Sequence, residues 1–66
     1  MTNNLRVERA VLRLTQDELA RRIGVSRQTI NAMEAGKYAP STLLALKLAQ
    51  VFGKSVEQLF RLENGD

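Results

Sequence analysis

Only three residues, Gly24, Val25 and Ser26, separate two predicted amphipathic helices at residues 16–23 and 27–35. Glycine tolerates the left-handed conformation that ends a helix, and a serine oxygen can accept the free N–H groups that begin the next helix. So short a connection forces an abrupt change of direction between the two helices. The central part of the chain is therefore restricted to two short helices that pack across a sharp turn.

Capping signals set the boundaries of the other helices. The pairs Thr15 and Glu18, and Ser55 and Gln58, have the spacing of capping boxes, in which each side chain bonds to the other residue's backbone N–H. Ser41 can cap a further helix, whose end is marked by a later glycine. The five predicted helices cover residues 5–12, 16–23, 27–35, 42–52 and 56–60.

The pattern of elements predicts an all-α fold. No long alternating run of apolar and polar residues indicates a sheet, although the segment FRLE at residues 60–63 can pair as a short strand with the N-terminal residues. A chain of 66 residues forms a single domain. We therefore expect one compact five-helix domain over residues 1–66, with room for a two-stranded pairing of its termini.

The composition removes several classes of site. Cysteine and histidine are absent, which excludes disulfides, thiolate or imidazole metal sites and the usual hydrolytic triads. No acidic pair, nucleophile with base, or phosphate-binding glycine loop has a useful spacing, so neither enzymatic activity nor a cofactor is expected. The sequence has no run of about 18 apolar residues, so no membrane span is predicted. The N-terminus is unlike a signal peptide, so a cytoplasmic protein is expected. The net charge of +3 permits a polyanionic partner without establishing one.

The helix predicted at residues 27–35 has an unusual exposed face. Ile30 and Met33 share its apolar side. Arginine can bond to guanine, glutamine or asparagine to adenine, and an alanine methyl can touch the thymine methyl in the major groove. Together with the short connection between them, the two helices have the sequence form of a helix-turn-helix at residues 16–35. A plain helical hairpin is the competing interpretation. The face opposite Ile30 and Met33 contains Arg27, Gln28, Asn31, Ala32 and Ala35.

Polar residues at helix starts, and just beyond the third helix, are candidates for phosphate contacts. Hydroxyls, amides, an ammonium group and the N–H groups of a helix N-terminus can all hold phosphate oxygens. Taken singly, each residue has a simpler explanation: Ser26 and Ser41 as helix caps, and Lys37 as a solvated surface charge. The candidates are Thr15, Gln16, Ser26, Lys37, Tyr38 and Ser41.

The stretch LTQDELARRIGVSRQTINAMEAGKYAPS, residues 14–41, resembles the helix-turn-helix of phage repressor and Cro-type regulators, also called the xenobiotic-response-element type. The flanking segments extend the likeness over nearly the whole chain. The resemblance implies a lambda-repressor-like domain that binds a palindromic operator in double-stranded DNA as a homodimer, usually to repress transcription. Many relatives carry a further sensing domain, and none is expected here because the chain stops after the fifth helix. The signature residues are Gln16, Leu19, Ala20, Gly24, Ile30, Met33, Glu34 and Gly36.

The resemblance also implies roles for single residues. It places Gln16, Arg27, Gln28 and Asn31 where the family contacts bases, and the helix at residues 27–35 in the major groove. It places Ser26, Lys37 and Ser41 near the phosphates. Arg9 and Glu34 resemble a family pair that ties the first helix to the third, so we expect them to be structural.

Apolar residues near the C-terminus exceed what a small monomer easily hides. We expect them to form a homodimer interface, which would supply the two-fold symmetry that a palindromic operator needs. Singly exposed leucines are the competing explanation. An antitoxin-like protein-interaction module that also regulates its own gene remains the alternative function. The interface candidates are Val56, Leu59, Phe60 and Leu62.

Overall fold

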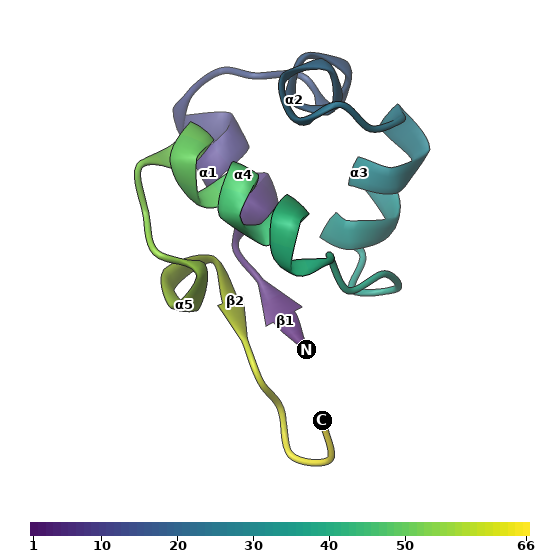
Figure 1. The fold of residues 1–66 in the computed structure, drawn as a ribbon, viewed down its shortest axis with the longest axis vertical. Helices are drawn as coiled ribbons and strands as arrows, with labels where there is room; N and C mark the ends of the chain where they lie inside the picture. The colour runs from purple at the N-terminus through teal and green to yellow at the C-terminus, as the bar shows by residue number, and fades with distance from the viewer.

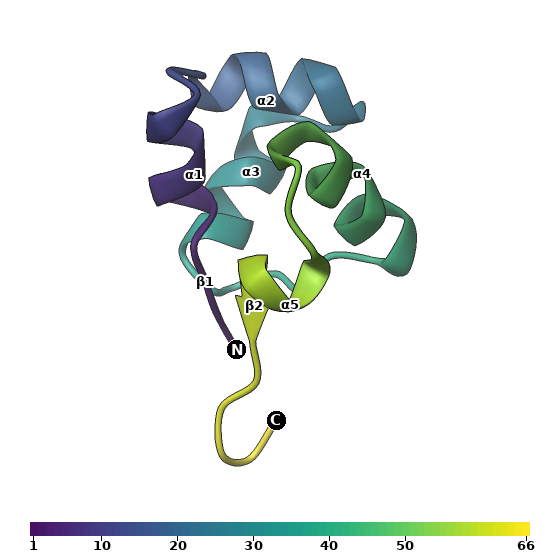
Figure 2. The ribbon, with the colours of Figure 1, turned by 90° about the vertical axis from the view of Figure 1, so that its left-hand side faces the viewer.

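Five helices and a two-stranded sheet make up the computed structural model of the chain, which describes residues 1–66. The helices surround one core, and the two short strands run side by side toward the ends of the chain (Figures 1 and 2). This architecture confirms the expected five-helix fold. The elements in chain order are β1 (Thr2–Asn3), α1 (Leu5–Val11), α2 (Gln16–Ile23), α3 (Arg27–Glu34), α4 (Thr42–Phe52), α5 (Val56–Leu59) and β2 (Phe60–Arg61).

The sheet joins the two ends of the chain. β1 and β2 are antiparallel, with Thr2 opposite Arg61 and Asn3 opposite Phe60, so the predicted pairing of the termini is confirmed. The Asn3 side chain connects this sheet to the helices. Its Nδ2 donates to the carbonyl of Met33 at 2.7 Å, and its Oδ1 accepts the N–H of Leu5 at 3.1 Å. β1 therefore holds the end of α3 close to the start of α1.

Side-chain caps start four of the five helices as predicted. In the first capping box, Thr15 Oγ1 accepts the N–H of Glu18 at 3.0 Å, and Glu18 Oε1 accepts the N–H of Thr15 at 3.1 Å. Ser55 and Gln58 form the second capping box, and Ser26 and Ser41 cap α3 and α4. None of the five helices is long and apolar enough to cross a membrane.

The turn directly after α1 contains the only residue other than glycine with a positive φ. Arg13 has a φ of 57°, its N–H donates to the carbonyl of Ala10, and the N–H of Leu14 donates to the carbonyl of Arg9, each at 3.0 Å. These two bonds form the Schellman pattern that ends many helices, usually with glycine in the left-handed position. Gly24 occupies the same position after α2, with a φ of 75°. Nothing in the sequence marks Arg13 for this conformation.

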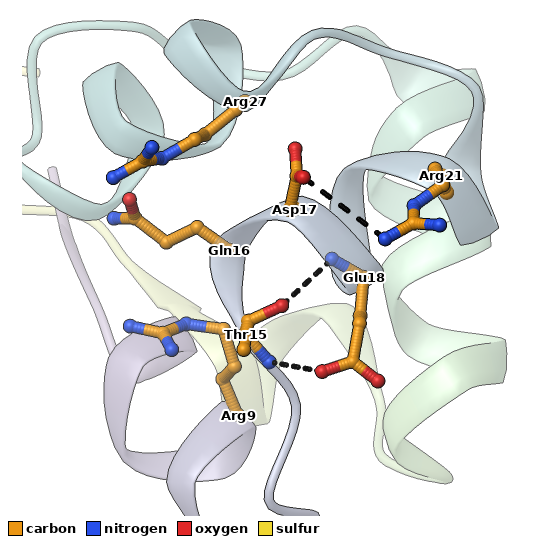
Figure 3. A pocket seen from close by; sticks show the side chains of 7 residues that line it. All are labelled: Arg9, Thr15, Gln16, Asp17, Glu18, Arg21 and Arg27. Atoms are coloured by element: carbon orange, nitrogen blue, oxygen red, sulfur yellow. Dashed lines mark hydrogen bonds and ion pairs between the residues drawn. The ribbon is translucent and has the colours of Figure 1, made fainter.

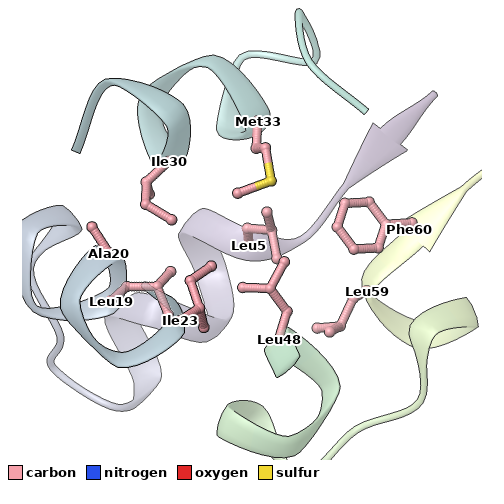
Figure 4. Packing of buried hydrophobic residues seen from close by; sticks show 9 residues of the cluster. All are labelled: Leu5, Leu19, Ala20, Ile23, Ile30, Met33, Leu48, Leu59 and Phe60. Atoms are coloured by element: carbon pink, nitrogen blue, oxygen red, sulfur yellow. The ribbon is translucent and has the colours of Figure 1, made fainter. Parts of the chain in front are cut away.

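One buried cluster joins all five helices to β2 (Figure 4). Leu59 is fully covered and Phe60 is only 8% exposed, because the short α5 turns directly into β2 and both residues pack inward. The core of the monomer already covers Leu59, which corrects its assignment to a dimer interface, whereas Phe60 keeps one exposed edge and its assignment stays a prediction. Val56 is half-buried and Leu62 is exposed. The cluster comprises Leu5, Leu19, Ala20, Ile23, Ile30, Met33, Leu48, Leu59 and Phe60.

Candidate nucleic-acid interface

α3 presents one polar face to solvent because its apolar face is fixed in the core. Ile30 and Met33 are at most 1% exposed. On the opposite side, Arg27, Gln28 and Asn31 are exposed and together line a shallow cleft of about 170 Å³ that contains no apolar residue. The structure thus gathers three of the predicted base-reading residues in one place. Ala32, the fourth predicted reader on α3, is half-buried.

Gln16 lies at the start of α2 in a second polar cleft of about 680 Å³, which also includes Arg27 (Figure 3). Its Nε2 donates to Glu34 Oε1 at 3.1 Å. Gln16 is therefore bound to a residue at the end of α3, in addition to lying beside a predicted base reader. This contact joins residues 18 positions apart, so the local sequence pattern does not predict it. The cleft is lined by Arg9, Thr15, Gln16, Asp17, Glu18, Arg21 and Arg27.

Arg9 and Glu34 form the ion pair that the family resemblance implies. Arg9 Nε donates to Glu34 Oε2 at 2.8 Å, and a terminal nitrogen of the same guanidinium donates to Oε1 at 3.2 Å. This two-point contact is the strong geometry for an arginine and a carboxylate. The Glu34 side chain is fully covered, and that of Arg9 is 18% exposed. Arg9 also donates to the carbonyl of Leu14 at 2.9 Å, so it ties α1, α3 and the start of α2 together.

A third arginine, Arg6, approaches the same carboxylate from solvent. Its Nε lies 3.6 Å from Glu34 Oε1, and its side chain is 70% exposed. Arg6 is not among the residues predicted from the sequence. Its position three residues before Arg9 places the two arginines on one face of α1, and this spacing is the signal that could have identified it.

The environment of Glu34 keeps its carboxylate charged. Burial raises the pKa of Glu34, but the hydrogen bonds from Arg9 and Gln16 and the charges of Arg9 and Arg6 outweigh burial, so the pKa lies below its ordinary value. The hydrogen bond from Glu34 in turn raises the pKa of Arg9, against the effect of burial. Both members of the pair are therefore charged at neutral pH. The Glu34 carboxylate is covered and paired, so it presents no exposed negative charge to a phosphate.

Apart from the half-buried Gln16, the predicted phosphate-contacting residues are exposed, but they differ in what they already bind. The hydroxyl oxygens of Thr15, Ser26 and Ser41 accept backbone N–H groups at the starts of α2, α3 and α4. Lys37 and Tyr38 lie just after α3 and form no ion pair or side-chain hydrogen bond within the chain. The structure therefore gives the three hydroxyls a capping role and leaves Lys37 and Tyr38 free.

Sequence comparisons match most of the chain. A family model described as helix-turn-helix matches residues 5–59. An uncharacterized HTH-type transcriptional regulator from Methanocaldococcus jannaschii is 50% identical over 66 residues, which cover all of both chains. Another from Bacillus subtilis is 43% identical over 63 residues, which cover 96% of each chain.

A structural comparison agrees with these matches. The crystal structure of a hypothetical transcription factor from Neisseria is similar, with a TM-score of 0.75 and 29% sequence identity. The match covers 83% of this chain, which spans 62% of the length of the Neisseria protein.

Proposed function

Because the chain belongs to the helix-turn-helix family, in which its relatives are named as transcriptional regulators, we propose that it represses transcription by binding a palindromic operator as a homodimer. In this proposal α3 lies in the major groove of double-stranded DNA. The observation that carries the proposal is the polar cleft of Arg27, Gln28 and Asn31, which has no carboxylate and lies opposite the buried Ile30 and Met33.

The exposed face of α3 supplies the groups that distinguish base pairs. Arg27 can donate two hydrogen bonds to guanine O6 and N7. Gln28 and Asn31 each carry an amide that can both donate to adenine N7 and accept from adenine N6. Ala32, one turn from Gln28, adds a methyl group that can touch the thymine methyl. These residues would read the sequence of one half-site.

Residues around α3 would hold the phosphates and fix its position in the groove. The N-termini of α2 and α3 carry free N–H groups, and the Thr15 hydroxyl beside α2 keeps a hydrogen to donate. The Ser26 hydroxyl beside α3 shares a hydrogen bond of 3.0 Å with the Thr29 hydroxyl. Ser41 offers the same group at the start of α4. Lys37 adds a free ammonium group and Tyr38 a phenolic hydroxyl at the far end of α3.

Exposed apolar side chains on α4 and the C-terminal segment, with the half-buried Val56 of α5, supply the proposed dimer surface. Leu46 is 54% exposed and Leu62 is 80% exposed. Leu46, Val56 and the edge of Phe60 line a largely apolar groove of about 280 Å³. A two-fold pairing across this groove would cover these side chains and give the dimer the symmetry of a palindromic operator.

We expect Gln28→Ala to weaken binding to the best operator by about 1 to 3 kcal/mol, the discrimination that one bidentate base contact provides. The melting temperature should stay nearly unchanged, because Gln28 faces solvent. Operators selected from a random DNA pool, and competitor DNA of random sequence, provide the two binding measurements. Gln50→Ala, which removes an exposed glutamine from α4, is the matched control and should change neither affinity. Equal losses on operator and random DNA would show that Gln28 does not read bases.

Binding should also depend strongly on salt. Each phosphate neutralised contributes about −0.9 to the slope of log affinity against log salt concentration. Lys37→Ala should weaken all DNA sequences alike and make the slope shallower by about 0.9 for each phosphate that Lys37 neutralises. Lys54→Ala is the matched control, since Lys54 is paired with Glu8 at 3.5 Å and should leave the slope unchanged. A slope near zero for the unaltered protein would contradict DNA binding altogether.

A further inference from the structure

α3 ends in a Schellman turn, which determines where the chain goes next. The N–H of Lys37 donates to the carbonyl of Ala32 at 2.9 Å. The N–H of Gly36 donates to the carbonyl of Met33 at 3.0 Å, and Gly36 has the left-handed φ of 74° that this turn favours. The backbone of Lys37 is therefore one of the two donors that close the turn, so the position of this residue depends on the shape of the turn.

The side chain of Asn3 holds this turn from outside α3. Its Nδ2 donates to the carbonyl of Met33 at 2.7 Å, the only side-chain hydrogen bond that a carbonyl of α3 accepts. The amide cannot flip, because its Oδ1 accepts the N–H of Leu5 at 3.1 Å and a carbonyl oxygen cannot donate. One carbonyl of α3 thus accepts both an N–H that closes the turn and the amide of a residue far away in the sequence.

Asn3 can act as an anchor because its own backbone is held on both sides. It lies in β1 opposite Phe60 of β2, and α1 begins two residues later with the fully buried Leu5. The N-terminal segment also approaches the turn directly, since a Cβ atom placed on Gly36 would lie 3.5 Å from the carbonyl oxygen of Met1. Figure 2 shows the chain after α3 passing beside β1.

Lys37 needs a fixed backbone if it is to bind a phosphate. Its side chain is exposed and forms no ion pair or hydrogen bond within the chain. A lysine side chain already loses considerable rotamer freedom when a phosphate fixes its ammonium group. Movement of the backbone would add to that cost. The segment between α3 and α4 contains no further helix or strand, so the turn is the restraint on this residue.

We propose that Asn3 is a positioning residue for Lys37, which fixes the turn after α3 and so directs the lysine ammonium group toward a phosphate. This inference rests on the proposed DNA binding and adds to it a residue of β1. It gives the sheet at the ends of the chain a part in DNA binding, although the sheet lies outside the helix-turn-helix. Because Lys37 would contact a phosphate and not a base, the effect of Asn3 should be the same for every DNA sequence.

The test is a double-mutant cycle on Asn3 and Lys37, measured with the selected operator and with random DNA. Asn3→Ser keeps an oxygen that can accept the N–H of Leu5, as serine does in turns of this kind, but its side chain is too short to reach Met33. We expect it to weaken binding to both DNAs by about three- to tenfold, the range that one hydrogen bond covers. The salt slope should become shallower, in the direction expected for Lys37→Ala. In the Lys37→Ala background, Asn3→Ser should have no further effect.

Asn4→Ser is the matched control, because it makes the same substitution in the neighbouring residue. Asn4 donates to the carbonyl of Gln58 at 3.2 Å and not to α3, so its replacement should change neither affinity. Each base pair of the operator is also replaced in turn, and Asn3→Ser should leave the base preferences unchanged, whereas a general loosening of α3 would lower them. Circular dichroism at the assay temperature should show the variants folded. If Asn3→Ser is unstable, Asn3→Thr makes the same change with a side chain that suits a strand better.

Three results would overturn the inference. If Asn3→Ser has no effect, or weakens binding equally with and without Lys37, Asn3 does not act through Lys37. If Asn3→Ser lowers the base preferences, Asn3 supports α3 as a whole. If Lys37→Ala changes neither affinity, Lys37 contacts no phosphate. In each case the proposed function stands as long as the unaltered protein prefers the operator to random DNA, and without that preference both fail.

Discussion

Replacing Arg9 by methionine should lower the free energy of unfolding by about 3 kcal/mol, because it leaves the Glu34 carboxylate buried without its main partner. An exposed ion pair contributes only about 0 to 1 kcal/mol, so the position of the pair decides the size of the effect. Glu34 is fully covered and Arg9 is 18% exposed, which places this pair with the buried ones. Arg6 approaches Glu34 from solvent at 3.6 Å and compensates in part, so we expect the lower end of the range for buried pairs.

Urea unfolding measures this effect, and Arg21→Met provides the matched control. Arg21 is paired with Asp17 at 4.0 Å, with both side chains about two-thirds exposed or more, so its replacement should change stability by less than about 0.5 kcal/mol. The effect of Arg9→Met should shrink in acid. The folded-state pKa of Glu34 is lowered, so the pair stabilises the fold above the ordinary pKa of a glutamate and this contribution is lost as the pH falls through the lowered value. Equal effects of the two substitutions at neutral pH would show that the buried pair contributes no more than a surface pair.

Inserting five base pairs between the two half-sites of the operator should weaken binding by at least about 30-fold. The centres of the half-sites are expected to lie about 10 base pairs apart, one turn of the duplex, because a two-fold dimer presents both α3 helices to the same side of the DNA. Half a turn more moves one half-site to the opposite side. Only one α3 can then bind specifically, and roughly half of the 4 to 10 kcal/mol that separates specific from random binding is lost.

Footprinting and equilibrium binding on the altered operators test this spacing. An insertion of ten base pairs should not restore tight binding. It returns the half-sites to one side of the duplex, but the longest dimension of a chain is only 32 Å, too short for a compact dimer to span two turns. The same five base pairs inserted outside the half-sites should have no effect. Tight binding at every spacing would mean that the chain does not read the operator as a rigid two-fold dimer.

The sequence predicts the helices well because their ends depend on neighbouring residues. The capping box of Thr15 and Glu18 is complete within four positions, and the start of α2 follows from it without knowledge of the rest of the fold. The same holds for Ser55 and Gln58 at α5. The exposed face of α3 is likewise predictable, because the helical period places Arg27 opposite the apolar residues of the same helix.

The remaining features depend on residues that are distant in the sequence. The pattern identifies Leu59 as apolar, but it cannot show whether the core or a second chain covers it, and the structure places it in the core. The contact between Gln16 and Glu34 forms only when α2 packs against the end of α3. At Arg13 the surrounding hydrogen bonds impose a backbone conformation that the residue type does not favour.

The pairing of β1 with β2 has a consequence for how the protein is made. Thr2 lies opposite Arg61, so this ladder closes a loop that contains all five helices, and long closures carry the largest entropic cost. α2 contacts both α3 and α4, which follow it closely in the sequence, so these three helices can pack early. During synthesis on the ribosome, α2, α3 and α4 can thus assemble first, and α3 carries the polar cleft of Arg27, Gln28 and Asn31. The core is completed only after residues 59–61 have emerged, because Leu59 and Phe60 are part of it.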